Sequence, residues 1–144
     1  MDAFPHEYKV AAHAASEGEI ILQAAGLENI ASAAPAQFDG PGDRWSPEDL
    51  LVASVADCFI LTFRAIAKFS QLDWSALECS ATGTLDKVER TTCFTAFEIN
   101  ARLVVPEGTD TDKAHKLLEK SEASCLVTNS LKSTVTLNAE VIVE

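Results

Sequence analysis

The sequence contains no cluster of basic residues. Its 144 residues include 11 Lys and Arg against 22 Asp and Glu, which gives a formal net charge of −11. A protein this acidic repels the phosphates of nucleic acids and the headgroups of anionic lipids. We therefore expect neither nucleic acid nor a membrane surface among its partners.

Metal-ligand spacing is missing as well. The four cysteines include no Cys-x-x-Cys pair, and His6, His13 and His115 are scattered along the chain. Zinc sites in proteins are usually built from closely spaced pairs of ligands. The sequence therefore predicts no metal site, and we expect no organic cofactor.

Long uninterrupted apolar runs are absent too. The run from 50 to 63 is broken by Ser54, Asp57 and Thr62, so it falls short of the ~18 apolar residues that a membrane span needs. No basic segment followed by an apolar one opens the chain, so the sequence shows no sign of export. We expect a cytoplasmic protein, whose cysteines serve chemistry or packing more often than structural disulfides.

The length of the chain favours a single domain. A protein of 144 residues normally buries about two-thirds of the surface of its unfolded form. No internal repeat, low-complexity tract or linker divides the sequence. We predict one domain that covers residues 1–144.

The most distinctive segment present is a helix start at residues 46–49. Ser46 is a good N-cap, and Pro47 suits the first helical position. The acidic pair that follows is favoured by the positive end of the helix macrodipole. From 50 to 63 apolar residues surround the helix axis, which predicts a helix buried on most sides. Cys58 lies in this stretch, so we expect it at the heart of the fold or of an interface.

Three later segments alternate between apolar and polar residues with the period of a strand. They are Leu77–Leu85, Cys93–Val105 and Leu131–Val143. The polar stretch Asp86–Thr91 between the first two predicts a hairpin. The residues expected on the inward faces are Leu77, Cys79, Ala81, Gly83 and Leu85, then Cys93, Thr95, Phe97, Ile99, Ala101, Leu103 and Val105, and finally Val135, Leu137, Ala139, Val141 and Val143.

The remaining elements complete an α+β pattern. An N-terminal hairpin is expected from residues 8–14 and 20–22, with a third strand around Asn29–Ser32, before a Pro- and Gly-rich loop. A second helix is predicted from Thr111 to Ser124. The residues that share one face of it are Ala114, Leu117, Leu118, Ser121 and Cys125. Strands, a long helix, two strands, a helix and a strand in this order indicate an α+β fold.

The four cysteines fall into two groups. Cys79 and Cys93 lie on the inward faces of predicted strands, where a free cysteine packs like a small apolar residue. Cys58 and Cys125 belong to the helical segments, and either core packing or redox chemistry fits their positions. A buried thiol has a raised pKa and is inert unless a cation or a hydrogen-bond donor stabilises the thiolate. Cys58 therefore needs an activating group if it reacts.

Glu48 is a candidate partner of Cys58, ten residues before it. On one straight helix this spacing corresponds to about 15 Å along the axis, so the two side chains cannot touch. They share a site only if the chain bends near Glu48 or if a second subunit contributes Glu48. We expect an obligate homodimer as the simpler solution. The alternative is a first-turn carboxylate that only stabilises the helix dipole.

Three stretches together resemble one protein family. They are Ser46-Pro47-Glu48-Asp49-Leu50-Leu51-Val52-Ala53, then Ala56-Asp57-Cys58-Phe59, and later Cys125-Leu126-Val127-Thr128-Asn129-Ser130-Leu131. The pattern is similar to that of the OsmC/Ohr family, the osmotically inducible protein C and organic hydroperoxide resistance proteins, over almost the whole chain. The resemblance implies an α+β fold in which antiparallel sheets wrap around long central helices in an intertwined homodimer.

The resemblance also implies a peroxidase of the oxidative stress response. Cys58 would be the peroxidatic thiolate, Cys125 the resolving thiol, and Glu48 the carboxylate that orients an arginine over the peroxide. The expected substrates are organic hydroperoxides, admitted by an apolar pocket of Leu, Val and Phe side chains. An external dithiol is the expected reductant of a Cys58–Cys125 disulfide.

One departure from the family pattern concerns the activating arginine. The family usually carries it in the loop between early strands, where this sequence reads Ala15-Ser16-Glu17-Gly18-Glu19, and no arginine precedes Arg44. Arg44 could bridge Glu48 and the Cys58 thiolate with its guanidinium, and a solvated loop residue is the alternative. Arg64 is a second candidate, which also fits a charge at the C-terminal end of the helix or a partner of Asp57, seven residues earlier.

Two rival functions fit the same residues. One is a noncatalytic protein that binds a small apolar ligand in the dimer pocket and uses its cysteines for packing, which the missing early arginine supports. The other is a thiol redox sensor in which disulfide formation changes an interaction surface.

Overall fold

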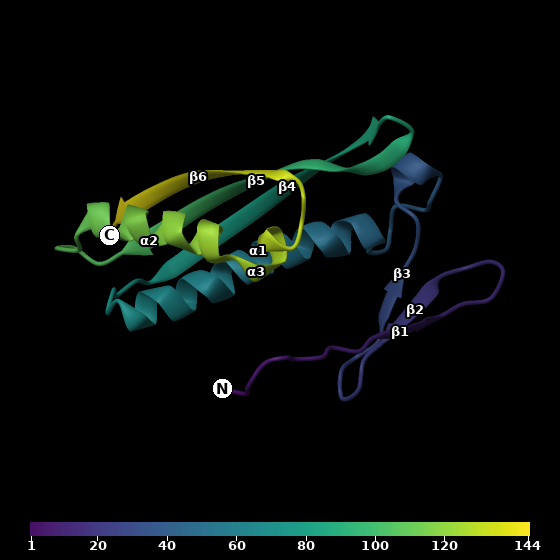
Figure 1. Ribbon diagram of the computed structural model, residues 1–144, viewed down its shortest axis with the longest axis horizontal. Helices are drawn as coiled ribbons and strands as arrows, with labels where there is room; N and C mark the ends of the chain where they lie inside the picture. The colour runs from purple at the N-terminus through teal and green to yellow at the C-terminus, as the bar shows by residue number, and fades with distance from the viewer. The chain divides into compact units, whose positions relative to one another are not determined.

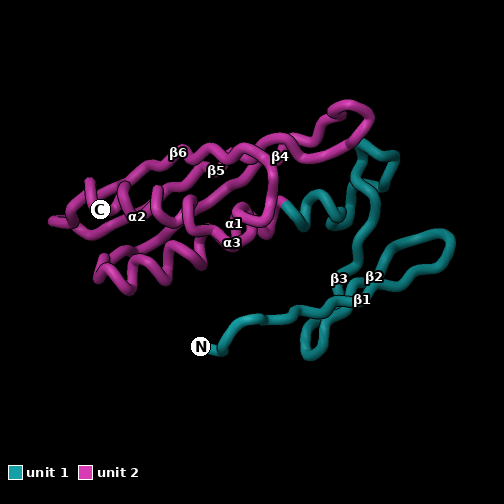
Figure 2. Tube along the Cα trace, in the orientation of Figure 1, with its two compact units in different colours: residues 1–51 teal, residues 52–144 magenta.

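The computed structural model describes residues 1–144, which group into two compact units, residues 1–51 and residues 52–144 (Figure 2). The boundary falls inside one continuous helix, α1 (Pro47–Phe69). The expectation of a single domain stays a prediction, because a boundary inside a helix does not show whether either unit folds alone.

The first unit is built around a small antiparallel sheet. β1 (Ala11–His13) pairs with β2 (Ile20–Gln23), which pairs with β3 (Ile30–Ser32). The predicted N-terminal hairpin and third strand are thus confirmed. A 3₁₀ turn, η1 (Ala36–Phe38), lies in the Pro- and Gly-rich loop. None of the apolar side chains of this unit is buried, so the sheet has no hydrophobic core of its own.

The second unit contains a sheet with the strand order β4-β5-β6 (Figure 1). β4 (Ala76–Val88) and β5 (Thr91–Val105) form the predicted hairpin. Its two-residue turn has positive φ at Glu89 (48°) and Arg90 (75°), as in a type I′ turn. β6 (Thr134–Val143) pairs with β5 in parallel, so the chain needs a crossover connection between these two strands.

One face of this second sheet is buried. The predicted alternation of β5 is confirmed, with Phe97, Ile99 and Leu103 inside the core. Two inward predictions are wrong, because Leu85 is 36% exposed and Val143 46% exposed. Leu85 follows a register shift in the β4–β5 ladder, which interrupts the alternation. Val143 is the last residue of β6, where the strand ends.

Helix α1 begins where the sequence predicts. The N–H of Asp49 donates to Oγ of Ser46 at 3.0 Å, as expected for an N-cap. Within the chain only one stripe of the helix is buried, so the expectation of a helix buried on most sides is wrong for a single copy. The residues of this stripe are Val55, Phe59, Phe63 and Ala67, and their spacing of four keeps them on one helical face.

By length and composition α1 could also cross a membrane. Its apolar window of 18 residues has a mean hydropathy of 1.9, and 22% of that window is buried. One such helix is weak evidence for a membrane span, because the core helix of a globular protein passes the same test. The expected cytoplasmic location stays a prediction.

A glycine allows α1 to approach the sheet closely. A Cβ atom on Gly83 of β4 would lie 2.8 Å from Cγ2 of Val52 on α1. The same atom would lie 2.9 Å from a ring carbon of Phe94 and 2.9 Å from one of Phe97. A larger residue would force the helix or the two rings to shift, so this close approach requires a glycine.

Helix α2 (Thr111–Ser124) coincides with the second predicted helix. Asp110 caps it by accepting a hydrogen bond from the N–H of Lys113. Nζ of Lys113 donates to the carbonyl oxygen of Ser70 at 2.8 Å, just after the end of α1. The start of α2 therefore lies beside the end of α1, and the two helices run in opposite directions (Figure 1). The predicted face of α2 is buried at Ala114, Leu117, Leu118 and Ser121.

Candidate active site

Cys58 lies in the middle of α1 and is half-buried. Its Sγ is 3.8 Å from Oγ1 of Thr62, one helical turn further along. It faces the end of α2 and the short helix α3 (Leu126–Asn129), because the backbone N–H groups of Leu126 and Val127 interact with its sulfur. The thiol is therefore surrounded by several hydrogen-bond donors.

Cys125 lies in the tight connection between α2 and α3 and is fully buried. Its backbone is extended (φ −65°, ψ 112°), which separates the two helices at this residue. The structure brings the Cys125 thiol within hydrogen-bonding reach of the Cys58 sulfur, and both cysteines are in the free thiol form. The antiparallel packing of α1 and α2 explains the approach of two residues 67 positions apart.

The pKa of the Cys58 thiol is lowered from its ordinary value. Partial burial opposes this shift, since it disfavours the charged thiolate. The lowering comes from hydrogen bonds that stabilise the thiolate, donated by the backbone N–H of Val127, the Cys125 thiol, the Thr62 hydroxyl and the backbone N–H of Leu126. Cys58 is thus prepared to act as a nucleophile without a cation among these donors.

Two other cysteines show the opposite behaviour. Burial raises the pKa of Cys125, and the neighbouring Cys58 raises it further, although the backbone and side chain of Thr128 partly compensate. Burial, with a smaller effect of Cys125, raises the pKa of Cys79 to about 11. A thiol with such a pKa is protonated at neutral pH, which fits the predicted packing role of Cys79.

Cys58 opens onto a groove of about 620 Å³ between α1 and the α2–α3 segment. The side chains that line it are mainly apolar, as expected for the entrance of an organic substrate. The predicted Leu and Val residues are present, but no Phe lines the groove, since Phe59 and Phe63 point into the core. The lining residues are Ser54, Asp57, Cys58, Leu61, Thr62, Ala65, Ile66, Lys120, Ser124, Leu126 and Val127.

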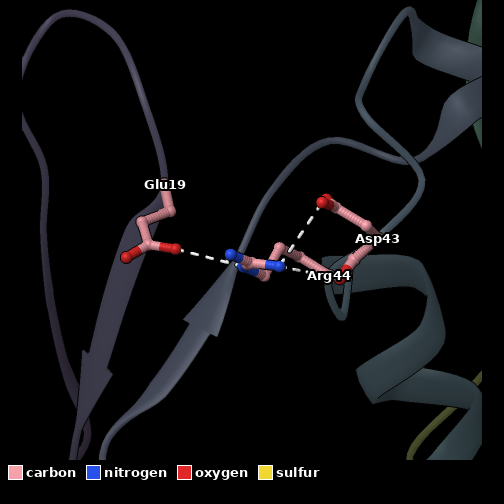
Figure 3. A network of polar contacts seen from close by, with 3 residues as sticks. All are labelled: Glu19, Asp43 and Arg44. Atoms are coloured by element: carbon pink, nitrogen blue, oxygen red, sulfur yellow. Dashed lines mark hydrogen bonds and ion pairs between the residues drawn. The ribbon is translucent and has the colours of Figure 1, made fainter.

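Arg44 belongs to the first unit and is held by two acidic residues (Figure 3). Its Nε donates to Oε2 of Glu19 at 3.1 Å, and its Nη1 lies 3.4 Å from Oδ2 of Asp43. The hydrogen bond to Glu19 and the charges of Asp43 and Glu19 raise the pKa of the guanidinium. The guanidinium of Arg44, which the predicted catalytic role requires, is therefore already bound to Glu19.

Strand register explains why Glu19 and Arg44 meet. Ile20 pairs with Ser32 in the β2–β3 ladder, and Ser32 forms a parallel bridge with Trp45. The residues that precede Ile20 and Trp45 are Glu19 and Arg44. Ser32 thus lies between Ile20 and Trp45, and the side chains of Glu19 and Arg44 on either side of β3 reach each other across this strand.

Glu48 lies in the first turn of α1, also in the first unit. The residue is half-buried, and its Oε1 atom is buried without any hydrogen-bond partner. A buried carboxylate oxygen without a donor is costly, so Oε1 of Glu48 has the capacity to accept a hydrogen bond that no group of this chain donates. The catalytic assignments of Glu48 and Arg44 stay predictions. Arg64 is exposed and does not line the groove.

Several residues around Cys58 carry no motif in the sequence. Thr62 is one helical turn after Cys58, so the spacing of four could have identified it. The donating N–H groups of Leu126 and Val127 belong to the backbone, and no side-chain pattern reveals them. Lys120 lies five residues before Cys125 on α2 and could be identified only once the direction of α2 relative to α1 was known. No group of three or more His, Cys, Asp or Glu is placed to hold a metal ion.

Comparisons with known proteins agree on one family. The family described as OsmC-like protein matches residues 40–140. Uncharacterized protein YmaD of Bacillus subtilis is 26% identical over 113 residues, which cover 76% of this chain and 75% of that protein. Peroxiredoxin OsmC of Escherichia coli is 27% identical over 93 residues, which cover 65% of this chain and 64% of that protein.

The fold is shared with solved structures. An OsmC-like protein of unknown function from Vibrio cholerae is similar with a TM-score of 0.84 at 19% identity, over 94% of this chain and 99% of that chain. This similarity confirms the predicted α+β fold of the OsmC/Ohr type, while the homodimer stays a prediction. Because the family match extends over most of the sequence, the chain belongs to the OsmC-like protein family.

Proposed function

We propose that the protein is a cysteine-based peroxidase that reduces organic hydroperoxides to alcohols. The observation that carries this proposal is the Cys58 thiol, which has a lowered pKa, opens onto an apolar groove and lies next to a second thiol, Cys125. The family includes a protein named as a peroxiredoxin, to which this chain is similar.

The first step uses Cys58 alone. Its thiolate attacks the terminal oxygen of the hydroperoxide, so that an S–O bond forms while the O–O bond breaks. The leaving alkoxide takes up a proton and departs as the alcohol, and Cys58 becomes a sulfenic acid. The donors around the sulfur keep it in the reactive thiolate form before the attack.

The second step uses the neighbouring thiol. The Cys125 sulfur attacks the sulfur of the Cys58 sulfenic acid, the hydroxyl group leaves as water with the proton of the Cys125 thiol, and a disulfide forms. The proximity of the two side chains supports this role, because the disulfide then needs no large backbone movement. An external dithiol reduces the disulfide by thiol–disulfide exchange and restores both thiols.

A homodimer is the second part of the proposal. Large apolar side chains are exposed in both units, and α1 is apolar but buried along one stripe only. Surfaces of this kind are typical of protein interfaces. A second copy would cover them and could supply the donor that Oε1 of Glu48 lacks. The exposed apolar residues of the first unit include Leu27, Ile30, Phe38 and Trp45.

Arg44 is our candidate for the cation that contacts the peroxide together with Glu48. In a single chain it is bound to Glu19 and Asp43 instead. These ion pairs are exposed, with Arg44 44% exposed, and exposed pairs contribute little stability. Arg44 can therefore leave Glu19 for a stronger, more buried partner at low cost.

A titration of thiols tests the peroxidase. We expect one equivalent of cumene hydroperoxide, added without oxygen, to remove two thiols and to produce a disulfide that peptide mapping assigns to Cys58 and Cys125. Cys58→Ser should abolish peroxide consumption, whereas Cys125→Ser should allow a single turnover and then stall or overoxidise. Undiminished steady turnover by Cys58→Ser would contradict this mechanism. Cys93→Ser is the matched control, because Cys93 does not line the groove.

A noncatalytic ligand-binding protein is the second candidate. The groove beside Cys58 and the engagement of Arg44 by Glu19 favour it. Four unchanged thiols after peroxide treatment, together with binding of an apolar ligand in the groove, would replace the peroxidase with this function.

A further inference from the structure

The two sulfurs of the candidate site differ in their access from outside. Cys58 lines the groove between α1 and the α2–α3 segment, whereas Cys125 is fully buried and does not line it. A disulfide between the two residues would present the Cys58 sulfur to the groove and keep the Cys125 sulfur in the core. In thiol–disulfide exchange the attacking thiolate must reach one of the two sulfurs. Only the sulfur of Cys58 is therefore open to an external reductant.

Attack at Cys58 is chemically unfavourable in one respect. The sulfur that is not attacked leaves as a thiolate, and a thiol with a lower pKa leaves faster. Attack at Cys58 makes Cys125 the leaving group, although burial raises the pKa of Cys125 and the pKa of Cys58 is lowered. The better leaving group is thus the one that access excludes. Reduction of the disulfide needs a group that stabilises the Cys125 thiolate as it leaves.

Thr128 of α3 can provide this stabilisation. It follows Cys125 by three residues and is buried, with 5% of its surface exposed. Its hydroxyl donates to the carbonyl oxygen of Cys125 at 3.2 Å. The backbone and the side chain of Thr128 both act on the Cys125 thiol and lower its pKa against the effect of burial. A hydroxyl proton rotates freely, so it can turn from the carbonyl oxygen to the thiolate without any movement of the backbone.

We propose that Thr128 is a further catalytic residue, which stabilises the Cys125 thiolate when an external dithiol attacks the Cys58 sulfur of the disulfide. The inference rests on the proposed function, because the disulfide of that cycle is its starting point. It assigns a direction to the reduction step and gives a role in that step to a residue that does not line the groove.

The reduction then proceeds in two exchanges. A thiolate of the dithiol bonds to the Cys58 sulfur while the Cys58–Cys125 bond breaks, and the electron pair of that bond leaves on Cys125, which takes up a proton. The second thiolate of the reductant attacks the reductant sulfur of the mixed disulfide and displaces Cys58 as a thiolate. The dithiol is oxidised to its own disulfide, and two electrons have passed to the protein. Cys58 needs no further help as the second leaving group, because its pKa is already lowered.

Trapping of the mixed disulfide tests the direction of attack. We would oxidise the protein with diamide to form the Cys58–Cys125 disulfide, add excess cysteamine and stop the reaction with acid after short times. A monothiol lacks the second thiol that releases Cys58, so the first adduct marks the attacked sulfur. Peptide mapping should find cysteamine on Cys58 and a free thiol at Cys125. An early adduct mainly on Cys125 would overturn the proposal.

Substitutions of Thr128 test the stabilisation of the leaving thiolate. Thr128→Val removes the hydroxyl and keeps the shape of the side chain, so reduction of the disulfide by dithiothreitol should slow by roughly three- to tenfold. Thr128→Ser should restore the rate, whereas a packing role would predict the reverse, because serine lacks the methyl group that valine keeps. A rate in Thr128→Val equal to that of the parent would contradict the role of the hydroxyl.

Ser121→Ala is the matched control for Thr128→Val. Ser121 carries a buried hydroxyl four residues before Cys125, but this hydroxyl donates to the carbonyl oxygen of Leu117 at 2.6 Å. The control should be reduced at the rate of the parent protein. Equal slowing in Ser121→Ala and Thr128→Val would show a general effect of a lost buried hydroxyl and would overturn the proposal.

The use of diamide separates this proposal from the peroxidase itself. Diamide forms the disulfide without a peroxide. If the protein consumes no hydroperoxide but cysteamine still attacks Cys58 and Thr128→Val still slows the reduction, the peroxidase fails while the role of Thr128 stands. If diamide does not join Cys58 to Cys125, the proposal fails, because the disulfide on which Thr128 would act does not form.

Discussion

The two units of the chain differ in how much of their apolar surface a single copy buries. The second unit, residues 52–144, has a continuous core in which Phe59, Ile99 and Leu118 are fully buried. The first unit, residues 1–51, has no buried apolar side chain and exposes Leu27 and Trp45. The same contrast holds for the candidate site: the two thiols of the second unit already lie together, whereas in the first unit Arg44 pairs with Glu19 and Oε1 of Glu48 has no hydrogen-bond partner. The thiol pair is therefore complete within one chain, whereas the proposed contact of Arg44 with Glu48 is not.

The largest expected effect concerns the core of the second unit. Phe59→Ala should lower the free energy of unfolding by about 3–5 kcal/mol at any protein concentration, because it leaves a cavity in the second unit. Leu27→Ala should cost within about 0.5 kcal/mol at concentrations at which the protein is monomeric and more where a dimer forms. Urea unfolding at two protein concentrations, with sedimentation to report the assembly, measures both. An effect of Leu27→Ala that does not vary with concentration would contradict a second copy over this unit.

A smaller effect is expected when the first unit loses its arginine. Arg44→Ala should lower the rate constant of peroxide attack by roughly tenfold or more, with thermal stability close to that of the parent, because the arginine forms only exposed ion pairs. Stopped-flow measurements of the first turnover give this rate constant.

Glu19→Gln tests the role of Arg44 from the opposite side, since it removes the negative charge that holds Arg44. We expect this variant to react at least as fast as the parent. Lys9→Ala is the control for Arg44→Ala, because it removes a cation elsewhere in the first unit. A rate unchanged in Arg44→Ala would move the role to Arg64 or to no arginine at all.

The smallest effect lies within the assembled site. The Thr62 hydroxyl lowers the pKa of Cys58 by stabilising the thiolate, so Thr62→Val should raise that pKa. At neutral pH less thiolate is then present, and alkylation of Cys58 should slow by roughly two- to fivefold, whereas at high pH the two proteins should react alike. The pH profile of alkylation by iodoacetamide measures this shift. A profile displaced to lower pH would show that the hydroxyl does not stabilise the thiolate.

Local sequence signals predicted both long helices and the strands of the second sheet. The Ser46-Pro47 start of α1, the alternation of β5 and the buried face of α2 are properties of short segments, and the structure follows them. The exposed positions of Leu85 and Val143 depend on a register shift and on a strand end, which alternation alone does not encode.

The site was less accessible to sequence reasoning. The family resemblance identified Cys58 and Cys125, but the donors that lower the pKa of Cys58 include backbone groups after Cys125, which have no side-chain signature. The pairing of Arg44 with Glu19 depends on strand register between segments 25 residues apart. The exposure of α1 could not be predicted either, because its apolar surface fits equally a core helix and an interface between copies.

The parallel pairing of β6 with β5 has a consequence for the order in which the protein matures. Cys125 lies in the crossover between these strands, so the ribosome completes β6 only after both cysteines have been made. A chain is synthesised from its N-terminus, and non-local parallel pairing forms slowly. The nascent chain would therefore carry Cys58 before the groups that lower its pKa are in place. The thiol would become reactive late in folding, after translation has ended.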